Sequence, residues 1–285
     1  MIRFRVVKGS HLLLAISVAA LIVVLALLLF VSPPRHADSA ARTSNPIQPE
    51  TEAMSAFASD SASLTVEIIR EPASPVVEPR ATILIYHTHT HEAYEQVDED
   101  PYVAVEAWRT KDDAHSVVRV GETLSSALES LGYAVVHDET DHELDALSTA
   151  YERSLNTIES YGHELDLLID LHRDAYVDGL ESCYTDTAGN EYAQLMLLVG
   201  RGDDYLPENR PDYDENLRFA QLVSRNANLL LPGICRNVTV KKSRYNQHLG
   251  KHAILVEVGH NRNTLKQAIA STGCLAKAID SALRS

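Results

Sequence analysis

The chain has 285 residues, which is enough for one domain of ordinary size with appendages. Its formal net charge of −15 makes the surface repel phosphate backbones, so we do not expect nucleic-acid binding. The 13 histidines are a high number for this length and hint at metal chemistry.

The first feature along the chain is an apolar run. Residues 12–31 carry no charge and are long enough to cross a bilayer core, which takes about 20 helical residues. The run is too long for the apolar part of a cleaved secretory signal. Three basic residues precede it and orient the amino terminus to the cytoplasm. We therefore predict a cytoplasmic tail at 1–11, a transmembrane anchor at 12–32 and an extracytoplasmic remainder.

Two further regions follow the anchor. Residues 33–76 are rich in Ser, Ala, Pro, Thr and Glu and are expected to form a flexible linker. Residues 77–285 are predicted to form the catalytic domain. In chain order, we expect a strand at 81–87, a helix at 114–131, a strand at 133–137, a helix at 144–161, a strand at 165–172, a hairpin turning at 188–190 before a strand at 192–199, a helix at 216–231, strands at 237–241 and 253–258, and a helix at 263–283. This alternation predicts an α/β fold with a mostly parallel sheet flanked by helices.

Polar side chains stand at the ends of three of these predicted strands. His89 and Glu92 follow the first, His172 ends the third, and Glu257 lies at the end of the last. In an open α/β sheet, sites form at the carboxyl ends of the strands, so we expect these residues to converge.

The residue types suit a catalytic zinc site. Two imidazoles and one carboxylate can bind Zn²⁺ and leave a fourth position for water. Zinc lowers the pKa of such a water and polarises a carbonyl, and Glu257 could carry the proton to a leaving nitrogen. His87 shares a strand face with His89 and is an alternative ligand. The His-x-x-Glu spacing with a distant histidine also fits a zinc carboxypeptidase or endopeptidase acting on cell-wall peptides.

The cysteines do not form a second metal motif. Cys183, Cys235 and Cys274 include no Cys-x-x-Cys pair, which argues against a thiolate zinc site. Outside the cytoplasm they could form at most one internal disulfide, and the sequence leaves the pair undetermined.

Six segments carry a resemblance to a known family. They are IYHTHTHEAY at 85–94, SVVRVGETL at 116–124, TDH at 140–142, IDLHRDA at 169–175, RYNQHL at 244–249 and AILVEVGHNRNTL at 253–265. In this order they resemble the stage II sporulation protein P family across nearly all of residues 80–285. The predicted anchor and linker also look like those of that family.

The resemblance implies a membrane-anchored peptidoglycan hydrolase with a fold like that of the zinc-dependent N-acetylmuramoyl-L-alanine amidases. Such an enzyme would cut the amide between N-acetylmuramic acid and L-alanine, and the family is also credited with cutting peptide cross-links. It would act during engulfment in sporulation, on the septal side of the cell membrane. The implied partners are the membrane-anchored stage II sporulation proteins D and M.

The resemblance also implies roles for individual residues. His89 and His172 match the zinc-binding histidines of the amidases, and Glu257 matches their catalytic glutamate. The ligating glutamate has no counterpart at the start of the first long helix, so the resemblance favours Glu92, with His115 as the alternative. Arg173 and Asn246 lie in family-like segments and are expected to bind substrate, although a loop-stabilising role fits them equally well.

Overall fold

A computed structural model describes residues 79–285, apart from residues 145, 163–164 and 181–182. All of them belong to the second of two units of the chain, Glu71–Ser285. The predicted tail, anchor and linker lie outside the described residues. Within the described part of the chain, no helix combines the length and the apolar character needed to span a bilayer.

The centre of the fold is a six-stranded sheet with the strand order β2-β1-β3-β8-β6-β7. The strands are β1 (Thr82–Tyr86), β2 (Ala134–His137), β3 (Leu167–Asp174), β6 (Leu195–Gly200), β7 (Thr239–Lys241) and β8 (Ala253–His260). Neighbouring strands are parallel except β6 and β8, which are antiparallel. The predicted α/β fold with a mostly parallel sheet is therefore confirmed, and the antiparallel pair was not foreseen.

Strand β1 shows why the sheet is buried on both faces. Side chains alternate across a strand, and here both sets are apolar. Ile83 and Ile85 belong to the larger of two core clusters, whereas Leu84 and Tyr86 belong to the smaller one. A continuous apolar run therefore becomes a strand with a core on either side.

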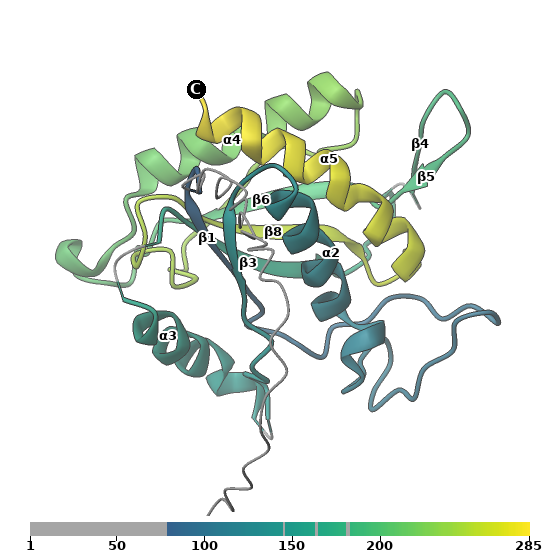
Figure 1. Ribbon diagram of the computed structural model, residues 1–285. Coiled ribbons are helices and arrows are strands. Elements are labelled where there is room, and N and C mark those ends of the chain that lie inside the picture. Colours follow the sequence, from purple (N-terminus) through teal and green to yellow (C-terminus); the bar gives the residue numbers. More distant parts are fainter. Residues whose placement is uncertain (1–78, 145, 163–164, 181–182) are drawn as a thin grey trace, which may run out of the picture. The chain divides into compact units, whose positions relative to one another are not determined.

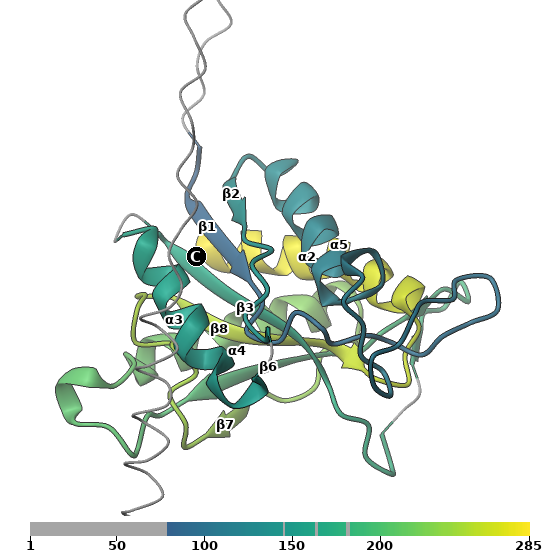
Figure 2. The ribbon, with the colours of Figure 1, turned by 90° about the horizontal axis from the view of Figure 1, so that it is seen from below.

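Four helices cover the two faces. They are α2 (Val117–Glu129), α3 (Ala150–Ser160), α4 (Tyr213–Leu230) and α5 (Leu265–Leu283). Side chains of α2, α4 and α5 join the larger cluster, and Ile158 of α3 joins the smaller one. Figures 1 and 2 accordingly show α2 and α5 on one side of the sheet and α3 on the other. The amino end of α5 is fixed by a capping box between Thr264 and Gln267.

The segment before α3 differs from expectation. The predicted helix at 144–161 begins only at Ala150, after the short 3₁₀ helix Leu147–Thr149. Leu144 and Leu147 continue the apolar spacing of the helix but are 55% and 54% exposed. Residues 138–144, which follow the edge strand β2, therefore form a loop rather than the start of the helix.

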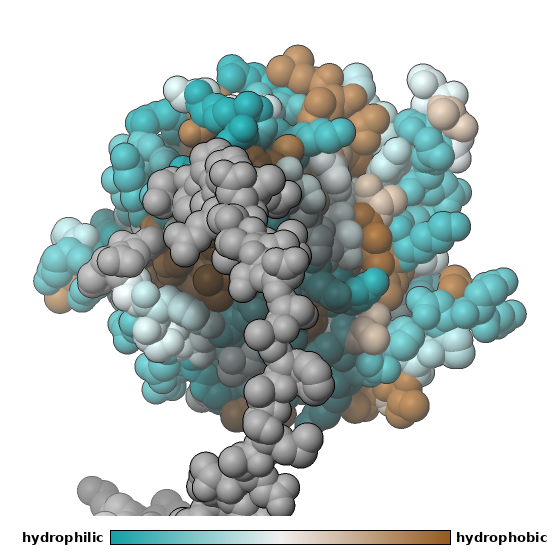
Figure 3. Space-filling model, in the orientation of Figure 1, coloured by the Kyte–Doolittle hydropathy of each residue, from teal (hydrophilic) through white to brown (hydrophobic). Residues whose placement is uncertain are grey.

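Two peripheral features complete the domain. Strands β4 (Tyr184–Thr185) and β5 (Glu191–Tyr192) pair as the predicted hairpin, which projects from the body in Figure 1. On the face shown in Figure 3, hydrophilic side chains predominate among the coloured residues and hydrophobic ones are scattered between them. This surface agrees with the acidic composition of the chain.

Candidate active site

The parallel strands β1, β3 and β8 are neighbours, so their carboxyl ends meet at one edge of the sheet. The register places His172 of β3 opposite Glu257 of β8. After β1 the chain turns, and the rings of His89 and His172 lie 5.3 Å apart between centroids. Nδ1 of His172 is 3.3 Å from Oε2 of Glu92. The sheet therefore brings together the four side chains predicted from three distant segments.

His172 lies between two carboxylates. Its side chain is 4% exposed, and its Nε2 is 2.8 Å from Oδ1 of Asp170, while Nδ1 faces Glu92. The contact with Asp170 is close but is not directed as a hydrogen bond. Burial alone would lower the pKa of His172, but Asp170 and Glu92 raise it well above the ordinary value. Asp170 is itself fixed by the backbone N–H and the hydroxyl of Thr88, which donate to it at 2.8 and 2.7 Å.

Glu92 is held in its ionised form. Its Oε2 accepts a hydrogen bond of 3.0 Å from the backbone N–H of Arg173. Burial would raise the pKa of Glu92, but His172 next to it, assisted by Arg173 and His89, lowers that pKa to about 2. Glu92 therefore presents a carboxylate rather than a carboxylic acid to His172.

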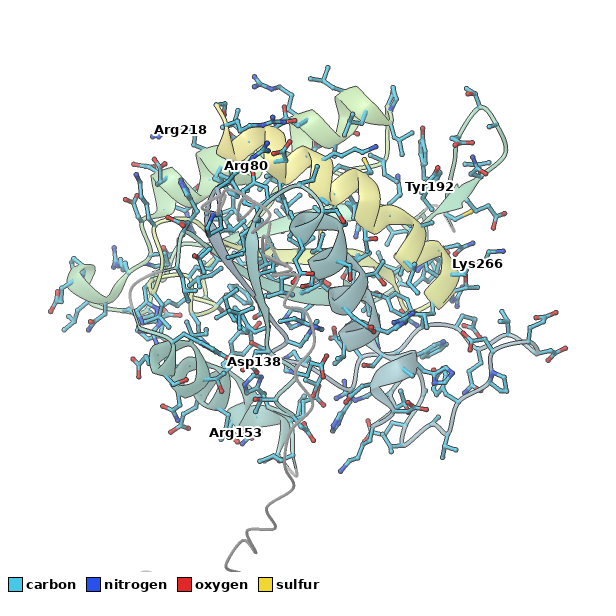
Figure 4. The ribbon with its side chains drawn as sticks, in the orientation of Figure 1. Arg80, Asp138, Arg153, Tyr192, Arg218 and Lys266 are labelled. Atoms are coloured by element: carbon cyan, nitrogen blue, oxygen red, sulfur yellow. The ribbon has the colours of Figure 1, made fainter. Side chains whose placement is uncertain are left out.

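His89 is supported from a different loop. Its Nδ1 is 3.4 Å from Oε1 of Glu143, whose side chain is 4% exposed. Glu143 also contacts Nδ1 of His91 at 3.2 Å and receives a hydrogen bond from Arg109. Arg153 of α3, labelled in Figure 4, donates to the backbone carbonyl of Glu143 at 2.9 Å. Burial and nearby His172 lower the pKa of His89.

Glu257 has the opposite electrostatic character to Glu92. Its Oε2 is buried and has no hydrogen-bond partner. Burial raises the pKa of Glu257 to about 8, and the negative charges of Glu92, Asp174 and Asp170 add to the rise, although His172 opposes it. Two glutamates at one edge of the sheet thus favour different protonation states, which is a pattern typical of acid–base sites.

The two alternative ligands lie elsewhere. His87 is fully buried, donates from Nδ1 to the carbonyl of Leu171, and has Nε2 2.9 Å from Nε2 of His137. His115 contacts Asp112 and Asp100 at 2.9 and 3.1 Å. These contacts engage both nitrogens of each ring away from Glu92, so the geometry favours His89 and Glu92.

The two predicted substrate-binding side chains are engaged with the protein. Arg173 donates from Nε to the carbonyl of Ala93 and from Nη2 to that of Trp108, both at 2.9 Å. Asn246 is 4% exposed and donates to the carbonyl of Tyr151 at 2.8 Å. These contacts support the loop-stabilising interpretation for both residues.

Sequence reasoning missed three neighbours of the cluster: Asp170, Glu143 and Tyr151. Asp170 precedes His172 by two positions on a strand, so the alternation of β3 could have placed it on the same face. Glu143 lies at the margin of the predicted helix, where no pattern marked it. The ring centroid of Tyr151 is 5.7 Å from that of His89, but in the sequence this residue lies inside a predicted helix and no motif marks it.

The cluster fits a zinc ion in its donor types, two imidazoles and one carboxylate. Nδ1 of His89 faces Glu143 and Nε2 of His172 faces Asp170, and neither nitrogen makes a directed hydrogen bond within the described residues. A histidine with a carboxylate behind one ring nitrogen is also the usual arrangement of a metal ligand. Among the residues that the structure describes, no three such side chains already converge as a formed metal centre.

Fold and site together define an α/β protein with a histidine–glutamate cluster at the carboxyl edge of its sheet. The sequence model of the family "Stage II sporulation protein P" matches residues 34–280. The chain therefore belongs to the stage II sporulation protein P family. A comparison with curated protein sequences found no match.

Solved structures with a similar fold include three N-acetylmuramoyl-L-alanine amidases. AmiC2 of Nostoc punctiforme is 15% identical, with 73% of this chain and 97% of that one covered and a TM-score of 0.42. Ami1 from Mycobacterium smegmatis is 11% identical, with 73% and 98% covered and a TM-score of 0.46. The amidase from Clostridium difficile 630 is 14% identical, with 72% and 95% covered and a TM-score of 0.44.

Proposed function

We propose that this protein is a peptidoglycan hydrolase that cuts the amide between N-acetylmuramic acid and L-alanine during engulfment in sporulation. Membership of the stage II sporulation protein P family supports the setting. The observation that carries the chemistry is the buried His172, set between Asp170 and Glu92 with Glu257 opposite it on the next strand.

His89, Glu92 and His172 would hold a zinc ion. When bound, zinc polarises the scissile carbonyl and makes water more acidic. The protein would fix the ligands in advance, since Asp170 contacts His172 and Glu143 contacts His89. Such outer contacts orient ligands and are as much a part of a metal site as the ligands themselves.

Glu257 would carry the proton. Water adds to the carbonyl carbon as Glu257 takes its proton at Oε2, and the same proton passes to the nitrogen of L-alanine as the carbon–nitrogen bond breaks. The products are the free lactyl carboxylate and a stem peptide with a free amino terminus. A carboxyl whose pKa is raised to about 8 holds a proton well enough to pass it on, and its ionised form, whose fraction grows as the pH rises toward 8, is the form that takes the proton from water.

The remaining predictions form part of the same proposal. The apolar run at 12–31 would anchor the protein in the cell membrane, and residues 33–76 would let the domain reach septal peptidoglycan on the outer side. The stage II sporulation proteins D and M would be its membrane partners, and cutting of peptide cross-links would be a further activity.

The proposal is tested with purified protein, muropeptides of known structure and mass spectrometry. We expect about one zinc per chain and release of stem peptides that begin with L-alanine. His172→Ala should abolish that release and lower the zinc content. His115→Ala is the matched control, because His115 lies outside the cluster.

Two outcomes would change the conclusion. Cleavage within the stem peptide, with the muramoyl amide intact, would favour the zinc carboxypeptidase or endopeptidase instead. A zinc-free protein whose wall degradation survives His172→Ala would end the metalloenzyme proposal.

A further inference from the structure

The turn between β7 and β8 has an unusual backbone. Tyr245 and Asn246 have φ values of 50° and 55°. Residues with a Cβ rarely adopt this region, and such a conformation persists only where the surrounding structure holds it. Two in succession therefore need a structural reason.

Buried amide side chains hold this turn in place. Asn246 donates from Nδ2 to the carbonyl of Tyr151 at 2.8 Å and to Oγ of Ser154 at 3.1 Å, which fastens the turn to α3. Gln247 accepts from the backbone N–H of Gly200 at 2.8 Å and donates to the carbonyl of Leu198 at 2.9 Å, which fastens it to β6. The strained conformation is thus fixed from two sides.

Close packing at Gly200 gives a third constraint. A Cβ on Gly200 would lie 2.3 Å from the carbonyl oxygen of Ser243 and 2.9 Å from Cδ2 of Tyr245. Only glycine lets β6 approach the turn this closely. The end of β6 therefore also determines where the Tyr245 ring lies.

The turn presents an aromatic ring toward the active site. The ring of Tyr245 lies 5.7 Å from that of Tyr151, edge to face, and Tyr151 lies 5.7 Å from His89 in the same manner. Tyr245 is half-buried, so the residue keeps part of its surface open to solvent. We call Tyr151 and Tyr245 the tyrosine wall, which extends from the cluster on the His89 side.

We propose that Tyr245 contacts the saccharide of the substrate and that Asn246 is a positioning residue acting through it. This inference rests on the proposed function. A pyranose ring has an apolar face of C–H groups, which packs well on a flat aromatic ring. The wall consists of uncharged rings, which suits a neutral sugar better than the ionised groups of a stem peptide.

The test is steady-state kinetics of the full chain on N-acetylmuramoyl peptides. Tyr245→Ala is expected to raise KM about threefold to tenfold, the value of one aromatic contact, with a much smaller change in kcat. Tyr245→Phe keeps the ring and should recover most of the lost affinity. Tyr161→Ala, which removes a more exposed tyrosine just beyond the far end of α3, is the control.

Asn246 is tested with a double-mutant cycle. Asn246→Ala should raise KM on its own, but Asn246→Ala combined with Tyr245→Ala should raise it no further than Tyr245→Ala does. Additive effects on KM would show that Asn246 does not act through Tyr245. Where Tyr245→Ala fails to fold, Tyr245→Leu, which keeps apolar volume without a flat face, takes its place.

Substrate length separates sugar from peptide contact. The defect of Tyr245→Ala should be the same for muramoyl peptides with short and long stems. The inference would be overturned if the rise in KM of Tyr245→Ala grew with stem length, or if its KM were unchanged. The proposed function would still stand in either case, provided that the wild type cleaves the amide. Absence of amide cleavage by the wild type would instead refute the proposed function.

Discussion

Asp170 joins two of the segments that carry the histidine–glutamate cluster. It receives two hydrogen bonds from Thr88, directly after β1, and contacts Nε2 of His172 on β3. One carboxylate therefore ties the turn that carries His89 to the strand that carries His172. Its charge keeps Nδ1 of His172 directed at Glu92.

We expect Asp170→Asn to lower the rate of amide cleavage about tenfold to a hundredfold, as is usual when the partner of a metal-binding histidine is changed. The amide preserves shape but removes the charge that orients the imidazole. Hydrolysis of purified muropeptides measures the effect. Asp166→Asn is the control, because Asp166 lies at the opposite, amino-terminal edge of the sheet, where it accepts from the N–H of Thr82. Equal rates in the two variants would contradict the assigned role.

Sequence alone could locate the cluster because its residues follow strands. Buried parallel strands are continuous apolar runs, and the residue that ends such a run marks the carboxyl edge of the sheet. His89, His172 and Glu257 were found in this way. Glu143 could not be found, because its contact with His89 depends on a loop whose path is set by Arg109, His91 and α3 rather than by a local pattern.

Helix α2 packs on the sheet through a glycine. Its Gly121 lies against the pair formed by His87 and His137, whose Nε2 atoms are 2.9 Å apart. Burial, with His137 nearby, lowers the pKa of His87 to about 3, so the pair is neutral and packs as two polar rings. The close approach of α2 to this histidine pair thus depends on the lack of a Cβ at Gly121.

Gly121→Ala is expected to destabilise the protein by about 1–3 kcal/mol, although alanine is the better helix former. The new Cβ would lie 2.5 Å from Nε2 of His137 and 2.6 Å from Nε2 of His87. Gly273→Ala in α5 is the matched control, since nothing lies within 4 Å of its Cβ position. That variant should gain about 0.5–1 kcal/mol. Urea unfolding of the two variants separates the effect of crowding from that of helix propensity. A Gly121→Ala variant that is more stable than the wild type would refute this packing.

Other elements show where local patterns stop being informative. The spacing of Leu144 and Leu147 continued a helical face, but both side chains are exposed and the helix begins later. The direction of β6 could not be predicted either, because an apolar strand has the same sequence pattern whether its neighbour is parallel or antiparallel. Both outcomes depend on contacts between distant segments.

The whole molecule is predicted to combine a tethered amino-terminal part with an acidic catalytic domain. We expect the full chain to stay in membranes during alkaline carbonate washing, because the run at 12–31 would span the bilayer. Removal of residues 1–76 should release a soluble protein that still cleaves muropeptides, since the six strands of the sheet and the histidine–glutamate cluster lie in residues 79–285.

A deletion limited to residues 33–76 provides the control for this prediction. It keeps the predicted anchor and should remain in the membrane, while cleavage of intact cell wall falls because the domain can no longer reach it. A full chain that washes off with carbonate would contradict the anchor.

The position of β8 in the chain has a consequence for biosynthesis. This strand follows the other five strands of the sheet in the chain, yet it joins β3 to β6 in the middle of the sheet and carries Glu257. A nascent chain that has reached only residue 252 lacks the strand that joins β3 to β6, and it lacks Glu257, the proposed proton carrier. We therefore expect chains without β8 to be inactive, so that hydrolysis could begin only after this strand has been made.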